Sequence, residues 1–159
     1  MPELQVGDRA PSFTLEDQHG RKVRLADFKG RPLVVYFYPK ADTPGCTTQA
    51  CALRDALDDL GALGAQVVGI SPDPPDRQAR FDAKHGLGFP LLSDEDHAVA
   101  QRWGVWGERS LYGRKFMGII RSAFVVDAKG RIAAAWYRIS PKDTVPKVRA
   151  ALEMLRAGG

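Results

Sequence analysis

The sequence predicts an α/β protein with a central mixed β-sheet and helices on both faces of that sheet. Residues 33–38 and 66–70 are continuous apolar and β-branched runs, which is typical of strands buried on both faces. Between them, residues 44–63 carry apolar side chains at a spacing of three and four, which predicts a helix. Residues 122–127 and 131–138 predict two further strands, and the Lys129-Gly130 turn between them favours an antiparallel hairpin.

The remaining elements fit the same architecture. Residues 13–15 and 22–25 alternate around a turn at 18–20, so an N-terminal β-hairpin extension is expected. Further helices are predicted over 74–84, 95–103 and 142–157, the last with a regular apolar face and Gly158 just after its end. No linker or repeat interrupts the pattern, so residues 1–159 are interpreted as one domain.

Composition limits the function classes that fit. The net charge is +4, and Lys and Arg are scattered apart from a denser stretch over 109–121, which is interpreted mainly as solvated surface. The first ten residues lack the charged start and apolar stretch of a signal peptide. No apolar run approaches the ~20 residues of a membrane span. The expected compartment is therefore the cytoplasm, where a close pair of cysteines more often serves redox chemistry or metal binding than a permanent crosslink.

The most informative segment follows the first buried strand. Thr43 suits a helix N-cap and Pro44 suits the first helical position, so Cys46 falls in the first turn. Unpaired backbone N–H groups and the positive end of the helix dipole favour a thiolate there. A thiolate can attack peroxide oxygen and become sulfenic acid, and Cys51 is a second thiol able to condense with it to a disulfide.

Two other interpretations of the cysteines compete with redox chemistry. Both can be small buried apolar residues, although the preceding strand, the Thr-Pro-Gly start and the partner thiol favour redox chemistry. A zinc site wants four ligands with partner Cys or His. The three histidines, His19, His85 and His97, are single and widely spaced, so surface or capping roles are expected for them and no metal is expected.

At these residues the sequence resembles a known family. Pro39, Thr43 and Cys46 match the peroxiredoxin motif Pro-x-x-x-Thr/Ser-x-x-Cys. Cys51, after four intervening residues, is similar to the bacterioferritin comigratory protein subfamily, also called peroxiredoxin Q. The stretches 7–13, 104–108 and 112–127 are similar to that subfamily too, so the resemblance extends over nearly the whole chain.

The resemblance implies a thioredoxin-like fold and a thiol peroxidase without metal or organic cofactor. Cys46 would be the peroxidatic cysteine and Cys51 the resolving one. Thr43 would hydrogen-bond the peroxide, Pro39 would cover the sulfur, and Arg121 would stabilise the thiolate and orient the substrate. Some peroxiredoxins carry Glu at the position of Gln49 and this subfamily often has Gln; Gln49 is left outside the predicted site.

The resemblance implies two partners, a hydroperoxide substrate and a thioredoxin-type dithiol reductant. Binding to nucleic acid or to a membrane is not expected, and the subfamily suggests a monomer or weak dimer. A thioredoxin-like disulfide reductase is a rival, but it would use Cys-x-x-Cys, which the sequence lacks. A nucleic-acid-binding module with an incidental cysteine pair is a second rival, and no recognisable motif supports it.

Overall fold

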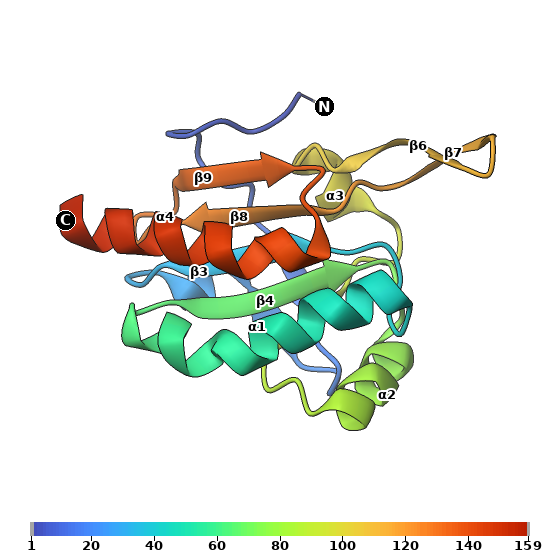
Figure 1. Cartoon of the computed structure of the whole chain (residues 1–159), viewed down its shortest axis with the longest axis horizontal. Helices are drawn as coiled ribbons and strands as arrows, with labels where there is room; N and C mark the ends of the chain where they lie inside the picture. The colour runs from blue at the N-terminus through green and yellow to red at the C-terminus, as the bar shows by residue number, and fades with distance from the viewer. Residues whose placement is uncertain (1, 159) are drawn as a thin grey trace.

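The computed structural model describes residues 2–158, and a seven-stranded mixed sheet forms its centre. The strand order is β2-β1-β5-β4-β3-β8-β9 (Figure 1). β3, β4 and β5 are parallel, whereas β8 pairs antiparallel with β3, and β9 antiparallel with β8. β1 and β2 form the antiparallel hairpin expected near the N-terminus. The strands are Thr14–Glu16 (β1), Lys22–Arg24 (β2), Leu33–Phe37 (β3), Gln66–Ser71 (β4), Leu91–Ser93 (β5), Ser122–Val126 (β8) and Ile132–Tyr137 (β9).

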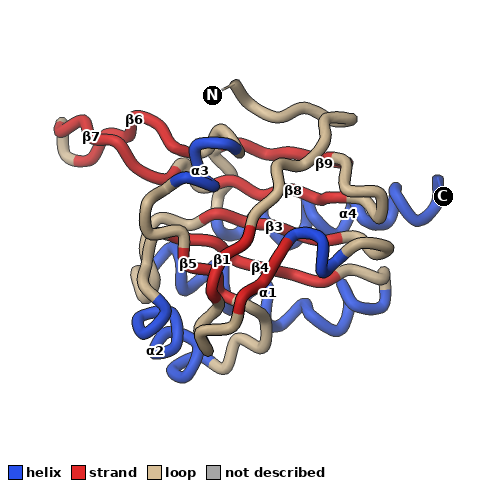
Figure 2. Tube along the Cα trace, turned by 180° about the vertical axis from the view of Figure 1, so that it is seen from behind, coloured by secondary structure: helices blue, strands red, loops and turns tan. Residues whose placement is uncertain are grey.

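Helices cover the sheet unequally on its two faces. α1 and α4 lie side by side on one face, in front of the sheet in Figure 1. The other face, seen in Figure 2, is covered by the short α3 and by the N-terminal part of the chain. The helices are Pro44–Ala62 (α1), Pro75–His85 (α2), Ala98–Arg102 (α3) and Thr144–Gly158 (α4), with 3-10 turns at Leu25–Phe28 and Pro141–Asp143. Among residues 2–158, no helix is long and apolar enough to cross a membrane.

The central strand β3 divides two hydrophobic cores. Every residue of β3 is buried, and successive side chains point to opposite faces. Val34 and Tyr36 join the core beneath α1 and α4, which also contains Cys46. Val35 and Phe37 join the second core. This alternation explains the uninterrupted apolar run, because a strand covered on both faces has no side left for water.

A second, two-stranded sheet projects from the body. β6 (Trp106–Leu111) and β7 (Arg114–Ile119) pair antiparallel around a tight turn. This hairpin extends beyond the end of the main sheet (Figure 1), and we call residues 106–119 the arm. The arm contains most of the basic stretch interpreted as solvated surface, and its strands were not predicted as such.

The predicted mixed sheet with flanking helices is confirmed, and the differences have local causes. The helix predicted over 95–103 begins only at Ala98, because His97 has a left-handed φ of 61° and the Asp94 carboxylate accepts hydrogen bonds from the N–H groups of Val99 and Ala100. The last helix begins at Thr144, after a 3-10 turn, instead of at residue 142. The three-residue β5 was missed, since so short a run carries no readable periodicity.

Candidate active site

Cys46 occupies the first turn of α1, as the sequence predicted. Thr43 is the N-cap with extended backbone angles, Pro44 is the first helical residue, and the Thr47 N–H donates to the Thr43 carbonyl at 2.8 Å. The Cys46 side chain is buried, with 1% of its surface exposed. Its sulfur is therefore shielded from bulk water in the first turn, at the positive end of the helix dipole, a setting that favours negative charge.

Arg121 reaches the sulfur from a distant part of the sequence. It immediately precedes β8, whose first residue, Ser122, pairs with Phe37 at the end of β3. That pairing brings Arg121 beside the start of α1, and its Nη2 donates to the Cys46 Sγ at 3.4 Å. A Cβ on Gly45 would lie 3.1 Å from the same Nη2, so glycine at this position leaves room for the guanidinium.

Gln49 belongs to this group, although the prediction from sequence excluded it. Its side chain is fully buried, and its Oε1 accepts a 2.7 Å hydrogen bond from Arg121 Nη1. Its Nε2 donates to Thr144 Oγ1 at 2.9 Å, and the Thr144 hydroxyl donates to the Ser140 carbonyl at 3.0 Å. The start of α4 therefore orients Gln49, and Gln49 holds one side of the guanidinium. Its spacing of three residues from Cys46 on one helix is the signal that could have identified it.

Thr43 differs in one respect from its expected helix-capping role. It occupies the N-cap position, but its hydroxyl donates to the Lys40 carbonyl at 2.8 Å and makes no cap hydrogen bond to the helix. With its proton directed backward, the hydroxyl retains lone pairs that can accept a hydrogen bond. Pro39, two residues after β3, is half-buried in the same loop.

A buried polar network anchors this loop. The Ala41 N–H donates to Asp73 Oδ2 at 2.7 Å, and the Ser71 hydroxyl donates to the same oxygen at 2.7 Å. Gln78 donates from Nε2 to Ser71 Oγ at 2.8 Å and accepts from the Tyr38 hydroxyl through Oε1 at 2.5 Å. The network joins the loop between β3 and α1 to the end of β4 and to α2, so it fixes the start of the helix that carries Cys46.

Two neutral phenols belong to the core that contains Cys46. Tyr36 and Tyr38 stack with ring centroids 5.3 Å apart and share a core with Cys46. Burial raises the pKa of Tyr36 well above its ordinary value, and burial likewise raises the pKa of Tyr38. Both rings therefore stay uncharged at neutral pH and place no competing anion beside Cys46.

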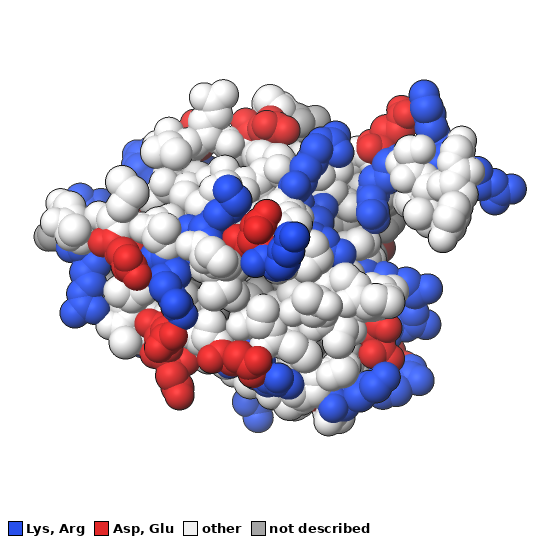
Figure 3. All heavy atoms as spheres, in the orientation of Figure 1, with Lys and Arg blue, Asp and Glu red and all other residues white. Residues whose placement is uncertain are grey.

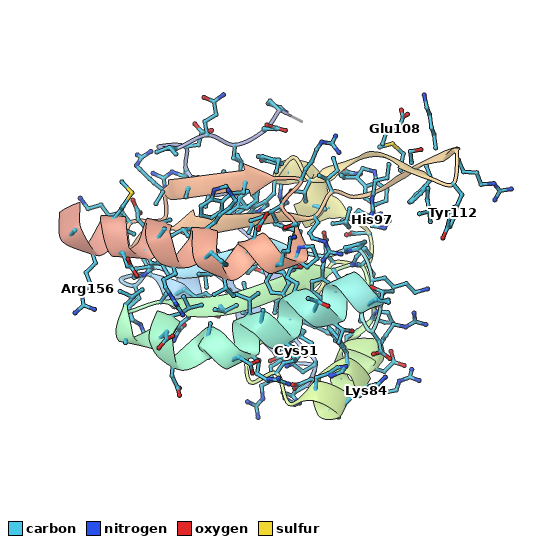
Figure 4. The ribbon with its side chains drawn as sticks, viewed as in Figure 1. Cys51, Lys84, His97, Glu108, Tyr112 and Arg156 are labelled. Atoms are coloured by element: carbon cyan, nitrogen blue, oxygen red, sulfur yellow. The ribbon has the colours of Figure 1, made fainter. Side chains whose placement is uncertain are left out.

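Cys51 lies further along the same helix and is half-buried (Figure 4). Both cysteines are free thiols. Because α1 is continuous from Pro44 to Ala62, the two Cα atoms are separated by about 140° and about 7.5 Å along the axis, roughly 8.7 Å in all. A disulfide requires less than about 7 Å without backbone movement.

The three histidines lie in three different surroundings. His19 is exposed, His85 lies 3.6 Å from Asp42, and His97 stacks on Trp106 at 3.9 Å. Within residues 2–158, no group of three or more His, Cys, Asp or Glu side chains is arranged to hold a metal ion.

A family model described as the AhpC/TSA family matches residues 6–135. The chain belongs to this family. Among curated proteins, it is 54% identical to peroxiredoxin Bcp of Escherichia coli K12 over 132 residues, which cover 83% of this chain and 85% of that protein. It is 52% identical to the putative peroxiredoxin Rv2521 of Mycobacterium tuberculosis H37Rv over 146 residues, covering 92% and 93% of the two chains.

Solved structures of this family agree with the fold described above. A mutant of Xylella fastidiosa PrxQ matches with a TM-score of 0.90 at 29% identity, covering 97% of this chain and 98% of that one. Xanthomonas campestris peroxiredoxin Q matches with a TM-score of 0.85 at 35% identity, covering 91% of each chain. The chain is thus a peroxiredoxin of the Bcp type with a thioredoxin-like fold, and the resemblance noted from its sequence is confirmed.

Proposed function

We propose that the protein reduces hydroperoxides with Cys46 and resolves the product with Cys51. The observation that carries this proposal is the 3.4 Å contact between Arg121 Nη2 and the Cys46 sulfur at the start of α1. A cation and a helix N-terminus both favour the thiolate, which is the nucleophilic form. The sulfur also lies in a compact, largely buried setting that suits a small electrophile.

In the first step, the Cys46 thiolate attacks one oxygen of the hydroperoxide and the O–O bond breaks. The sulfur is oxidised to sulfenic acid, and the other oxygen takes a proton and leaves as water or an alcohol. In this scheme the Thr43 hydroxyl accepts a hydrogen bond from the peroxide, and the planar Arg121 fork binds sulfur and oxygen together. Pro39 limits access of water to the sulfur in this scheme.

In the second step, the Cys51 thiol condenses with the sulfenic acid, forming a disulfide and releasing water. The intact helix keeps the cysteines too far apart, so the first turns of α1, around residues 43–51, must unwind before the bond can form. Unwinding removes Cys46 from its buried setting and exposes the disulfide. A dithiol reductant of the thioredoxin type then returns both cysteines to thiols.

The relatives support this assignment. Xanthomonas campestris bacterioferritin comigratory protein, whose structure matches with a TM-score of 0.85 at 34% identity, has been studied for alkyl peroxide reduction in trapped intermediate and ligand complexes. We extend that substrate class, together with hydrogen peroxide, to the present chain. We further propose that it acts as one domain, as a monomer or weak dimer, without a cofactor, in a reducing compartment such as the cytoplasm, because the cycle depends on reduction of its disulfide.

The test is mass spectrometry of the reduced protein after one equivalent of hydrogen peroxide. The wild type should lose two hydrogens as the disulfide forms. Cys51→Ser should gain one oxygen on Cys46 and then stall or over-oxidise, whereas Cys46→Ser should neither gain oxygen nor turn over with a thioredoxin system. Normal thioredoxin-linked turnover of Cys46→Ser would refute the assignment.

A further inference from the structure

The arm exposes an unusual amount of apolar surface. Of the six large hydrophobic residues that are exposed among those described, four lie on it: Leu111, Tyr112, Phe116 and Met117, with 57%, 96%, 42% and 54% of their surfaces exposed. The arm that carries them projects beyond the end of the main sheet. Exposed apolar surface that is rimmed by polar residues marks interaction sites.

The two faces of the arm differ in charge. Side chains alternate along a strand and paired residues share a face, so the pairing register assigns each residue. One face begins at its base with Trp106 and Ile119, which pack on the second core, and carries Glu108, Ser110, Lys115 and Met117 beyond them. Lys115 lies 3.6 Å from Glu108, so these opposite charges balance. We call this the outer face.

The opposite face, which we call the inner face, carries Arg109, Leu111, Arg114 and Phe116. It has two cations and no acid, and Arg109 lies over the Phe116 ring at 5.8 Å. The arrangement is a basic and apolar surface whose charge is not neutralised within the arm.

The inner face is turned toward the candidate active site. Figure 4 shows Glu108 on the side of the arm that points away from the body. Tyr112, at the tip of the arm, points to the opposite side, toward the start of α1. At the base of the inner face, a Cβ on Gly107 would lie 2.7 Å from Ile120, so the Ile120 side chain packs there. Ile120 is adjacent in sequence to Arg121, which contacts Cys46. Figure 3 shows the arm projecting over the right-hand end of the molecule, and basic residues lie both on the arm and on the body below it.

We propose that the inner face of the arm docks a protein dithiol reductant whose thiols are surrounded by an acidic and apolar surface. This inference rests on the proposed function, in which the Cys46–Cys51 disulfide must be reduced. A thiolate of the partner attacks one sulfur of that disulfide, which forms a mixed disulfide and releases the other cysteine as a thiol. The second thiol of the partner then attacks the mixed disulfide and releases the remaining cysteine. The two thiol protons of the partner end on Cys46 and Cys51, and the partner leaves as a disulfide.

Geometry explains why the partner meets the arm. The attacking sulfur must contact a sulfur at the unwound start of α1, and a folded partner placed there occupies the space beneath the overhanging arm. Arg109 and Arg114 then lie opposite the acidic rim of the partner, while Leu111 and Phe116 contact its apolar centre. Such a surface gives orientation and association rate through charge, and affinity through a few apolar anchors.

The chain offers a closely matched pair of variants for the test. Arg114→Glu/Phe116→Ser changes the inner face, and Lys115→Glu/Met117→Ser makes an equivalent change on the outer face of the same strand. Peroxide turnover is measured with a bacterial thioredoxin, thioredoxin reductase and NADPH, and separately with dithiothreitol as a small dithiol. Circular dichroism checks that both variants fold, and Arg114→Glu alone serves if the double variant does not.

We expect the inner-face variant to have a KM for thioredoxin about tenfold above that of the wild type, equivalent to about 1.4 kcal/mol, once any change in its KM for dithiothreitol has been divided out. The outer-face variant should stay within about twofold of the wild type. Added salt should raise the thioredoxin KM of the wild type more than that of the inner-face variant, since charge reversal removes the attraction that salt screens.

Three results would overturn the docking proposal. The first is an equal thioredoxin KM in the two variants, and the second is a wild type recycled by dithiothreitol but not by thioredoxin. The third is a wild-type dimer that the inner-face variant dissociates without changing the KM, which would assign the face to a second copy of the chain. Failure of the proposed function has a different signature, because Cys46 of the wild type would then not be oxidised by peroxide at all.

Discussion

Replacing Gln49 with Met is expected to slow peroxide attack without changing either cysteine. Met fills a similar volume but cannot accept the 2.7 Å hydrogen bond from Arg121 Nη1 or donate to Thr144. The guanidinium then loses its buried partner on one side. It gains rotational freedom and swings toward solvent, away from the Cys46 sulfur.

The magnitude follows from the separation of the charges. At an effective dielectric constant of about 20, a unit charge pair at 3.4 Å interacts by about 5 kcal/mol, and at about 6 Å by about 3 kcal/mol. Losing about 2 kcal/mol of stabilisation of the thiolate and of the charged transition state corresponds to about a 30-fold slower reaction. Gln49→Glu keeps an acceptor for Arg121 and should recover part of the rate, although its negative charge opposes the thiolate.

The assay is stopped-flow oxidation of the reduced protein by hydrogen peroxide, quenched for mass spectrometry of Cys46. Gln101→Met on α3 is the matched control, because the same substitution is made at an exposed glutamine. Thr144→Val removes the hydroxyl that orients Gln49 and should have a smaller effect in the same direction. Oxidation of Gln49→Met as fast as that of Gln101→Met would refute the positioning role of Gln49, and so would a normally folded Gln49→Glu that shows no recovery.

Four further outcomes are expected. Arg121→Ala should slow oxidation of Cys46, because the cation beside the sulfur is lost. Arg121→Lys restores the charge but should recover only part of the oxidation rate, since the planar fork is missing; equal rates in the two variants would contradict this. Hydrogen exchange across residues 43–57 should be faster in the disulfide form than in the reduced form, and equal protection would argue against unwinding of α1. Asp73→Ala leaves the loop between β3 and α1 without its buried acceptor. It should lower the free energy of unfolding by about 1–3 kcal/mol, which is typical of a buried hydrogen-bonding group left without its partner, and it should slow oxidation of Cys46. An unchanged thermal melt would contradict the anchoring role of Asp73. Burial raises the pKa of Asp94, so its ionisation opposes folding: this cost is absent below the unfolded pKa of about 3.9 and is fully present once the pH exceeds the folded value. Urea unfolding from pH 3 to 7 should therefore show the wild type losing stability relative to Asp94→Asn as the pH rises, and parallel curves would disprove the effect.

Local features of the site could be predicted because they depend on neighbours in sequence. The N-cap at Thr43, the proline after it and the position of Cys46 in the first turn all follow from local helix chemistry, and the structure confirms them. The direction of the Thr43 hydroxyl did not follow, since the Lys40 carbonyl competes with the helix N–H groups for it. The roles of Thr43, Pro39, Arg121 and Cys51 in catalysis stay predictions until the variants are measured.

The sequence by itself determined the buried strands, the long helices and the cysteine pair, because hydrophobic periodicity and helix-start chemistry are written in adjacent residues. Only the tertiary structure decided that the partner of Arg121 is Gln49, that α4 orients it through Thr144, and that Asp73 holds the loop before Cys46. It also decided that the basic stretch forms an arm with one neutral and one basic face. The contacts of Gln49 and Asp73 join residues that are tens of positions apart, and strand pairing and packing create them, whereas the spacing of residue types along the chain carries no record of them.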